Sequence, residues 1–164
     1  GNQEFWQKVI DNTYLKYKGL GTWHNVLMDT VVREGRLVMP TGRVYTFKRT
    51  EKGEWPRTQI LNYPVQGLGH DLMSIARVSL YKRMRKAKLK SLLICTVHDS
   101  IVVDGPLQEA KKVVQLMYDV FDDIPSNFGR LFGVEFNLPL RCEISIGENW
   151  GAMTEINKEF FDAN

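Results

Sequence analysis

The sequence predicts an α+β fold in which a small antiparallel sheet, containing one tight hairpin, is backed by helices. Apolar residues recur at helical spacing in several segments, and two β-branched runs flank a His-Asp pair at residues 98–99. Polar and apolar residues also alternate strictly from Leu140 to Ile146. The 164 residues suffice for one domain with a hydrophobic core, and a composition of 43% hydrophobic and 25% charged residues is typical of a globular protein.

The first third of the chain predicts two helices and a short hairpin. Apolar residues at helical spacing indicate one helix over about 4–18 and another over about 22–34, which Gly35 closes. Strand, turn and strand follow over 36–47, with the turn at residues 40–43. Residues 48–56 are polar and contain Gly and Pro, so we expect a loop and a subdomain boundary there.

The longest helix is predicted from about Gly67 to Lys88. One face carries Leu68, Leu72, Ile75, Ala76, Ser79, Leu80 and Met84. Its tail is basic, with Lys82, Arg83, Arg85, Lys86, Lys88 and Lys90. These cations suit either a solvated helix end, where they complement the helix dipole, or a phosphate-binding patch. The sequence favours the solvated end, because no aromatic residue is interleaved with them.

The segment Ser91–Asp104 predicts a tight hairpin with His98 and Asp99 as its turn. Asp and His tolerate the positive φ that such turns can require. A carboxylate held at the tip of a stiff hairpin is a candidate metal ligand, because its position is fixed before the metal arrives. An ordinary Asp-containing turn is the alternative.

The last third predicts a helix that Pro106 opens and that runs through Phe121, followed by an irregular segment over 125–133. A strand over 138–147 and a short helix over 153–161 complete the expected elements.

Composition excludes several classes of protein. No apolar run approaches the ~20 residues needed to span a bilayer, and the first residues do not resemble a signal peptide. Cys95 and Cys142 lie in apolar runs, which favours reduced, buried thiols and an intracellular location. A net charge of +3 permits a nucleic-acid partner without requiring one.

Other catalytic patterns are weak. His24 and His70 fall in predicted helices, where packing or surface roles are expected, and no zinc, Walker or dinucleotide pattern is found. Ser100, His98 and Asp99 cannot form a nucleophilic triad, because neighbours in a tight turn do not all face one another.

Asn62 and Gln66 stand four residues apart, on either side of Pro64, where we expect the first turn of the long helix. Two amides on one side of a helix could read base edges in a DNA minor groove. Hydrogen bonding at the start of the helix is the alternative use for them.

These motifs together resemble the C-terminal part of family A DNA polymerases, the bacterial DNA polymerase I group. The residues that carry the resemblance are Asn62, Gln66, Gly67 and Asp71, then Val97, His98 and Asp99, and finally Leu138–Leu140 with Ile146–Trp150. The segment from Tyr17 to Phe47 is similar to the family's region between the nucleotide-binding helix and the palm. The resemblance covers nearly the whole chain, and its divergence suggests a phage or other viral source. It implies a cytoplasmic location, in a bacterium or a virus-infected host cell.

The resemblance implies a role for each matched residue. Asp99 would be the second catalytic carboxylate, holding paired Mg²⁺ ions beside the primer 3′-hydroxyl and the incoming dNTP. His98 would lie against the primer backbone, and Asn62 and Gln66 would contact the new base pair and the template from the minor groove. Residues 1–56 would be the C-terminal part of the fingers, and 57–164 a segment of the palm.

Three departures from the family pattern matter. Ser100 replaces the usual Glu, and His-Asp-Ser is typical of single-subunit phage-type RNA polymerases, which leaves RNA synthesis as an alternative. Thr58 replaces an Arg that the family has four residues before the Asn, so Arg57, one position away, is the candidate DNA contact. The first catalytic Asp motif and the triphosphate-binding helix are absent from the chain.

The expected partners are therefore primer-template DNA, dNTP and the remainder of the polymerase, in cis or as a separate chain, with no membrane. The isolated chain is expected to be inactive. A non-catalytic DNA-binding or replisome module with a palm fold is the further alternative.

Overall fold

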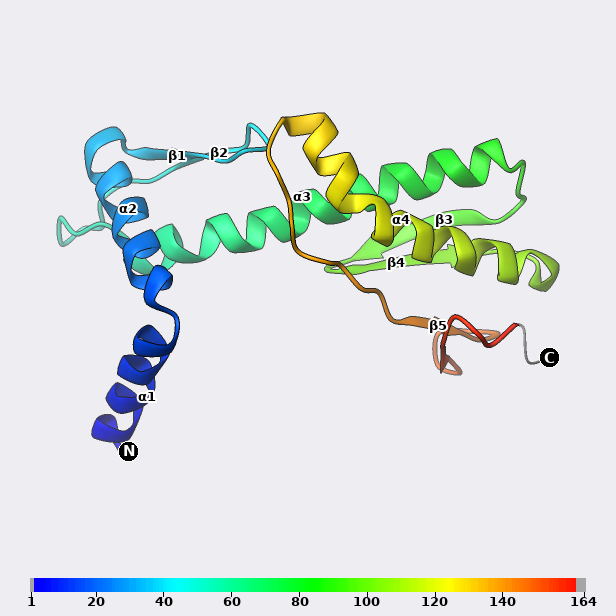
Figure 1. Ribbon diagram of the computed structural model, residues 1–164, viewed down its shortest axis with the longest axis horizontal. Coiled ribbons are helices and arrows are strands. Elements are labelled where there is room, and N and C mark those ends of the chain that lie inside the picture. Colours follow the sequence, from blue (N-terminus) through cyan, green and yellow to red (C-terminus); the bar gives the residue numbers. More distant parts are fainter. Residues whose placement is uncertain (1, 162–164) are drawn as a thin grey trace. The chain divides into compact units, whose positions relative to one another are not determined.

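The computed structural model describes residues 2–161, which form two compact units that divide between Leu68 and Gly69 (Figure 1). It confirms the α+β fold class, with helices and three two-stranded antiparallel sheets in the described part of the chain. No described helix combines the length and the apolar character that a membrane span requires.

The first unit contains two helices and a hairpin, as predicted. Helix α1 spans Gln3–Lys16 and α2 spans Lys18–Glu34. Gly35 ends α2 in the left-handed conformation (φ 69°), which a residue without a Cβ adopts at little cost. Strands β1 (Arg36–Val38) and β2 (Val44–Thr46) then pair with Leu37 opposite Tyr45. The buried core of this unit consists of Val31, Leu37, Phe47 and Ile60.

Helix α3 spans Arg57–Lys86, so the predicted start at Gly67 is wrong by ten residues. Pro64, which suggested a boundary, lies inside the helix and is buried. A proline removes one hydrogen bond from a helix interior and disfavours the preceding turn. Packing offsets this cost here, because Ile60, one turn earlier, is fully buried in the core.

The second unit places a hairpin and two helices around one core. Strands β3 (Leu92–Val97) and β4 (Ser100–Asp104) form the hairpin, and the short 3-10 helix η1 (Leu107–Glu109) leads into α4 (Ala110–Phe132). The core joins α3 to α4 through Ala76, Leu80, Met84, Leu116, Val120 and Ile124. Three of these, Ala76, Leu80 and Met84, lie on the stripe that the sequence predicts for the long helix.

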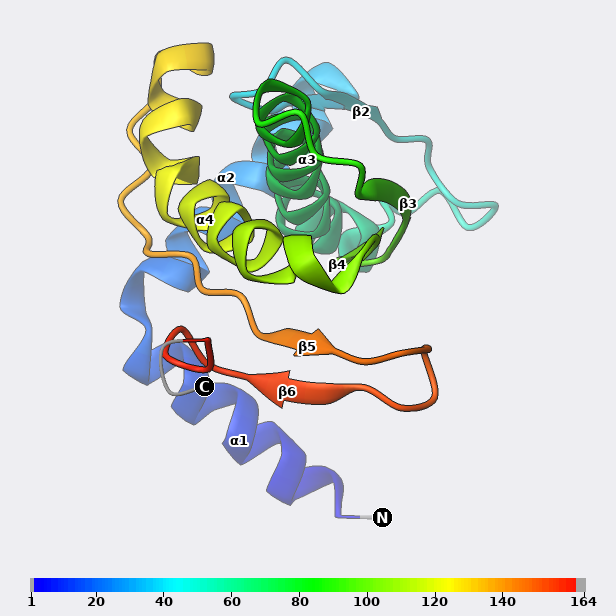
Figure 2. The same cartoon turned by 90° about the vertical axis from the view of Figure 1, so that its right-hand side faces the viewer.

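Helix α4 is apolar on a second side, where the final hairpin packs. Val114 and Tyr118 form a cluster with Ile144 and Ile156 from strands β5 (Ile144–Ile146) and β6 (Thr154–Ile156). Figure 2 shows this hairpin on the other side of α4 from α3. Helix α4 is therefore central to the second unit.

Three predictions in this region are wrong. Residues 125–132 continue α4 through Pro125, because Ile124 and Phe128 on either side are buried, and the helix ends only at Gly133 (φ 68°). The strand predicted over 138–147 is reduced to Ile144–Ile146. Residues 154–156 form a strand and not a helix, since Ile156 pairs with Ile144 and completes the cluster beside α4.

Candidate nucleic-acid and metal site

The tip of the β3–β4 hairpin holds His98 and Asp99, as predicted. Val97 pairs with Ser100, which leaves only these two residues in the turn. His98 adopts a positive φ of 52°, a conformation that tight hairpin turns require and that non-glycine residues seldom adopt. The Ser100 hydroxyl donates a hydrogen bond of 2.8 Å to the Val97 carbonyl oxygen across the turn. The pairing and the hydrogen bond between Val97 and Ser100 thus close the turn directly beneath the tip.

One side of the hairpin packs on the core of the second unit. Leu93, Ile101 and Val103 are partly buried against the α3–α4 cluster. By contrast, Leu92 and Ile94 are 65% and 55% exposed. The register shifts between Leu93 and Cys95, so Ile94 is an extra residue in β3. The core therefore supports one side of the hairpin, while the apolar side chains of Leu92 and Ile94 remain exposed.

The base of the hairpin is held by Glu109. Its carboxylate accepts hydrogen bonds from the Lys90 backbone N–H (3.0 Å), the Ser91 backbone N–H (2.8 Å) and the Ser91 hydroxyl (2.6 Å). These hydrogen bonds lower the pKa of Glu109. The bond from the Lys90 backbone has the largest effect, and the bond from the Ser91 hydroxyl has the next largest. Gly105 lies so close to Ser91 that a Cβ at residue 105 would overlap its side chain. This contact was not predicted from the sequence, because Glu109 and Ser91 are 18 residues apart and neither matches a motif.

Asp99 has the properties of a free ligand. It is exposed and makes no hydrogen bond or ion pair with any residue that the structure describes. A carboxylate is a hard oxygen donor of the kind that Mg²⁺ prefers. Within residues 2–161 no group of three or more His, Cys, Asp or Glu side chains comes together as a metal site. Asp99 therefore fits one carboxylate of a divalent-metal site, and the chain's described residues do not complete that site.

Asn62 and Gln66 lie inside α3 and not at its first turn, since the helix begins at Arg57. Both are exposed, and residues four apart lie on the same side of a helix. Pro64 and Gly67 are buried between and beside them. The first unit thus brings Asn62 and Gln66 together, and the second brings His98 and Asp99 together. Arg57 is exposed at the first residue of α3.

Gly67 is needed for packing within the first unit. A Cβ on this residue would overlap the Tyr45 hydroxyl and lie 2.8 Å from the Tyr45 ring carbon Cζ. Tyr45 in turn contacts Tyr63, with ring centroids 5.5 Å apart. The glycine that follows Gln66 therefore lets β2 approach the helix at the level of the two amides.

The Gly147–Trp150 segment forms the first part of the connection between β5 and β6. A Cβ on Gly147 would overlap the Ala152 carbonyl oxygen, and the Asn149 side-chain oxygen accepts a 3.0 Å hydrogen bond from the Gly151 N–H. The Ala152 N–H donates to the Asn149 carbonyl oxygen at 3.0 Å. Gly147 and Asn149 therefore shape this turn, whereas Trp150 is 66% exposed.

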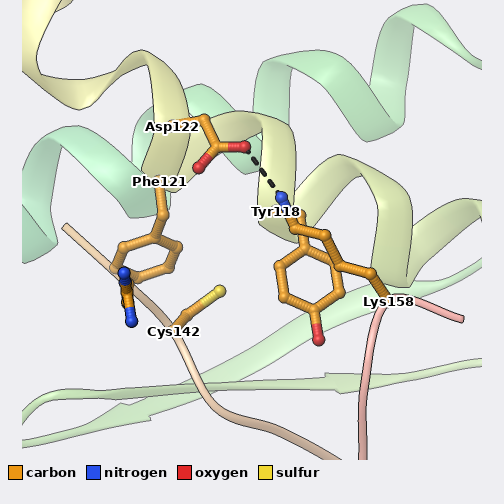
Figure 3. Close-up of a pocket in the computed structure, with 6 residues that line it drawn as sticks. Tyr118, Phe121, Asp122, Cys142 and Lys158 are labelled. Atoms are coloured by element: carbon orange, nitrogen blue, oxygen red, sulfur yellow. Dashed lines mark hydrogen bonds and ion pairs between the residues drawn. The ribbon is translucent and has the colours of Figure 1, made fainter. Parts of the chain in front are cut away.

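A small pocket beside α4 contains none of the predicted site residues (Figure 3). It is lined by Tyr118, Phe121, Asp122, Arg141, Cys142 and Lys158. Lys158 Nζ lies 3.1 Å from Asp122 Oδ2 and 4.9 Å from the Tyr118 ring centroid, so its charge is already partnered. Burial raises the pKa of the Cys142 thiol, which is half-buried and free, as Cys95 is.

Comparison with known proteins decides the family. The family model "DNA polymerase family A" matches residues 2–152. The chain belongs to DNA polymerase family A. It is 22% identical to DNA polymerase I of Chloroflexus aurantiacus over 92% of this chain and 16% of that protein. It is 34% identical to the thermostable DNA polymerase I of Thermus aquaticus over 54% of this chain and 9% of that protein.

A solved structure shows the same fold. The POL domain of Pol1 from M. smegmatis, in complex with DNA primer-template and dNTP, matches with a TM-score of 0.67 and 18% identity, over 74% of this chain and 22% of that one. The chain thus spans about one sixth of the length of the Chloroflexus aurantiacus polymerase and less than a quarter of this structure. The phage or viral source remains a prediction.

Proposed function

We propose that the chain is the end of the fingers (residues 1–56) and a segment of the palm (57–164) of a template-directed DNA polymerase that acts in replication or repair. The observation that carries this proposal is Asp99: an exposed, unpartnered carboxylate at the tip of a supported hairpin, in a chain of DNA polymerase family A. Nucleotidyl transfer from dNTP to a primer 3′-hydroxyl is the reaction, and primer-template DNA and dNTP are the partners.

Asp99 would hold Mg²⁺, for which its oxygen atoms are suitable. When bound, paired Mg²⁺ ions lower the pKa of an attacking hydroxyl and stabilise a leaving pyrophosphate. The chain's own part is to fix the carboxylate: the Ser100–Val97 hydrogen bond defines the turn, and the core beneath β3 and β4 supports it. His98, next to Asp99, would contact the primer backbone.

Asn62 and Gln66 would contact the nascent base pair and the template, and Arg57 the DNA nearby. Neutral amides suit this task, because correct base pairs of either orientation offer similar acceptors in the minor groove. Their exposure on one side of α3 supports the assignment.

A second polypeptide segment would complete the enzyme, in cis or as a separate chain. The described residues supply one carboxylate and no further metal-ligating cluster. The exposure of Leu92 and Ile94 on the hairpin supports an additional covering segment, since apolar side chains favour burial. We therefore expect the isolated chain to be inactive.

Primer extension tests the proposal. The purified chain with primer-template, dNTP and Mg²⁺ should give no extension, and addition of a family A fragment that bears the first Asp motif should restore it. Incorporation of ribonucleotides in preference to deoxyribonucleotides would favour the RNA polymerase alternative. Extension by the highly purified chain alone would contradict the proposed division of the active site.

A further inference from the structure

The end of α3 and the residues that follow it are strongly basic. The nine residues from Lys82 to Lys90 contain six cations and no acid. The whole chain has a net charge of +3, so the remaining residues together carry a net charge of −3. This segment therefore carries a local excess of positive charge.

Most of these cations are unpaired. Arg83 forms an ion pair with Asp123 on α4 at 2.5 Å, and Lys90 interacts electrostatically with Glu109. The other four, Lys82, Arg85, Lys86 and Lys88, are exposed and have no acidic partner among residues 2–161. Four unpartnered cations within seven residues, from Lys82 to Lys88, can attract a polyanion.

Lys88 holds a position where helices usually have glycine. The Leu89 N–H donates to the Met84 carbonyl oxygen at 3.1 Å and the Lys88 N–H to that of Arg85 at 3.1 Å, which is the Schellman pattern of a helix end. Lys88 is the residue in the left-handed conformation of this motif, with φ 55°. A lysine is strained in this conformation and a glycine is not, so this cation occupies a position that costs backbone energy.

An aromatic side chain lies among the cations on the helix surface. Arg77, Tyr81 and Arg85 follow one another at intervals of four residues and are all exposed, with Tyr81 55% exposed. The basic tail identified in the sequence begins at Lys82, so Tyr81 lies just outside it. Cations that flank an exposed aromatic ring form the combination that binds single-stranded nucleic acid, in which phosphates contact the charges and a base stacks on the ring.

We propose that Arg77, Tyr81, Lys82, Arg85, Lys86 and Lys88, named here the α3 tail patch, bind single-stranded DNA without sequence preference. The patch is separate from the hairpin tip: Lys90 and Ser91 precede β3, whose six residues extend about 20 Å from this base to His98 and Asp99. Binding at the patch does not depend on the metal chemistry assigned to Asp99, so the two proposals fail independently.

The experiment measures fluorescence anisotropy of a labelled oligonucleotide bound to the full chain at several salt concentrations. The patch variant carries Lys82→Gln, Arg85→Gln, Lys86→Gln and Lys88→Gln. The control variant carries the same change at four exposed lysines of the first unit, Lys8, Lys18, Lys48 and Lys52. We expect the patch variant to bind single strands at least about tenfold more weakly, and the salt slope to fall by roughly 2.8, while the control stays near wild type. An equal loss in both variants, or no loss in the patch variant, would overturn the proposal.

Tyr81→Leu separates stacking from charge. This variant should weaken single-strand binding by about 5- to 100-fold without changing the salt slope, and leave duplex binding unaltered. Wild-type affinity for single strands in this variant would overturn the assignment to single-stranded DNA. Displacement of the oligonucleotide by poly-glutamate at equal charge concentration would also overturn it, in favour of an acidic protein partner.

Discussion

His98 allows the geometry of the hairpin tip to be tested by one substitution. Its φ of 52° lies in the left-handed region, which costs a residue with a Cβ about 1–2 kcal/mol and costs glycine almost nothing. The side chain is exposed and forms no hydrogen bond within the described chain, so its removal loses little packing. Relief of backbone strain is therefore the main effect that His98→Gly should have on the folded state.

The unfolded state acts in the opposite direction. A glycine adds conformational freedom to the unfolded chain, which lowers stability by about 0.4–1 kcal/mol. The two terms together predict that His98→Gly raises the free energy of hairpin opening by roughly 0.5 kcal/mol. His98→Val should lower it by about 1 kcal/mol, because a β-branched residue at positive φ is a strong outlier.

Native-state amide hydrogen exchange of β3 and β4 measures this free energy locally and does not require the two units to unfold together. The order of stability should be His98→Gly, then wild type, then His98→Val. A His98→Gly hairpin that opens more easily than wild type by more than about 0.5 kcal/mol would show that the imidazole stabilises the turn, and would refute the strain argument.

Three further predictions concern packing and pH. Gly67→Ala should lower the free energy of unfolding by about 1–3 kcal/mol, because the added methyl group overlaps Tyr45. Tyr45→Leu in the same chain should restore part of this loss. An unchanged urea midpoint for Gly67→Ala would contradict the contact between Gly67 and Tyr45. Leu80→Ala removes a side chain that is 1% exposed and should cost about 2–5 kcal/mol in urea unfolding, whereas Val78→Ala, at a position that is 48% exposed on the same helix, should cost far less. Glu109 has a lowered pKa, so its stabilising contribution is complete above the ordinary carboxyl pKa of 4.5 and is lost as the pH falls through the lowered value. Wild type should therefore be more stable than Glu109→Gln at neutral pH, and the stabilities of the two proteins should converge in acid. A stability difference that does not change with pH would refute the hydrogen bonds assigned to the Glu109 carboxylate.

Local sequence signals predicted the parts of the structure that local interactions determine. The β3–β4 hairpin and its two-residue turn follow from β-branched runs around His98 and Asp99, and the end of α2 follows from Gly35. These features depend on residues close to one another in the sequence, and the structure reproduces them.

Long-range packing determined what the sequence did not predict. Pro64 and Pro125 suggested breaks, yet both helices continue through them because Ile60, Ile124 and Phe128 are buried nearby. Residues 154–156 form a strand because Ile156 meets Ile144, twelve residues away.

The same limit applies to the site. The sequence motifs predict Asp99 as a metal ligand and place it correctly at the hairpin tip, but the Glu109 contact that holds the hairpin base joins residues 18 apart. The place of Gly67 against Tyr45 likewise depends on two elements that are distant along the chain.

The proposed role of Asp99, a metal-holding carboxylate in nucleotidyl transfer, is tested most directly by a single-turnover measurement in the reconstituted polymerase. The hairpin offers a matched control, because Asp104 is an exposed aspartate at the other end of β4. Asp99→Ala should slow transfer by at least about 1000-fold, which corresponds to several kcal/mol of lost transition-state stabilisation, while Asp104→Ala should stay close to wild type. Transfer by Asp99→Ala at a rate near that of Asp104→Ala would contradict the account.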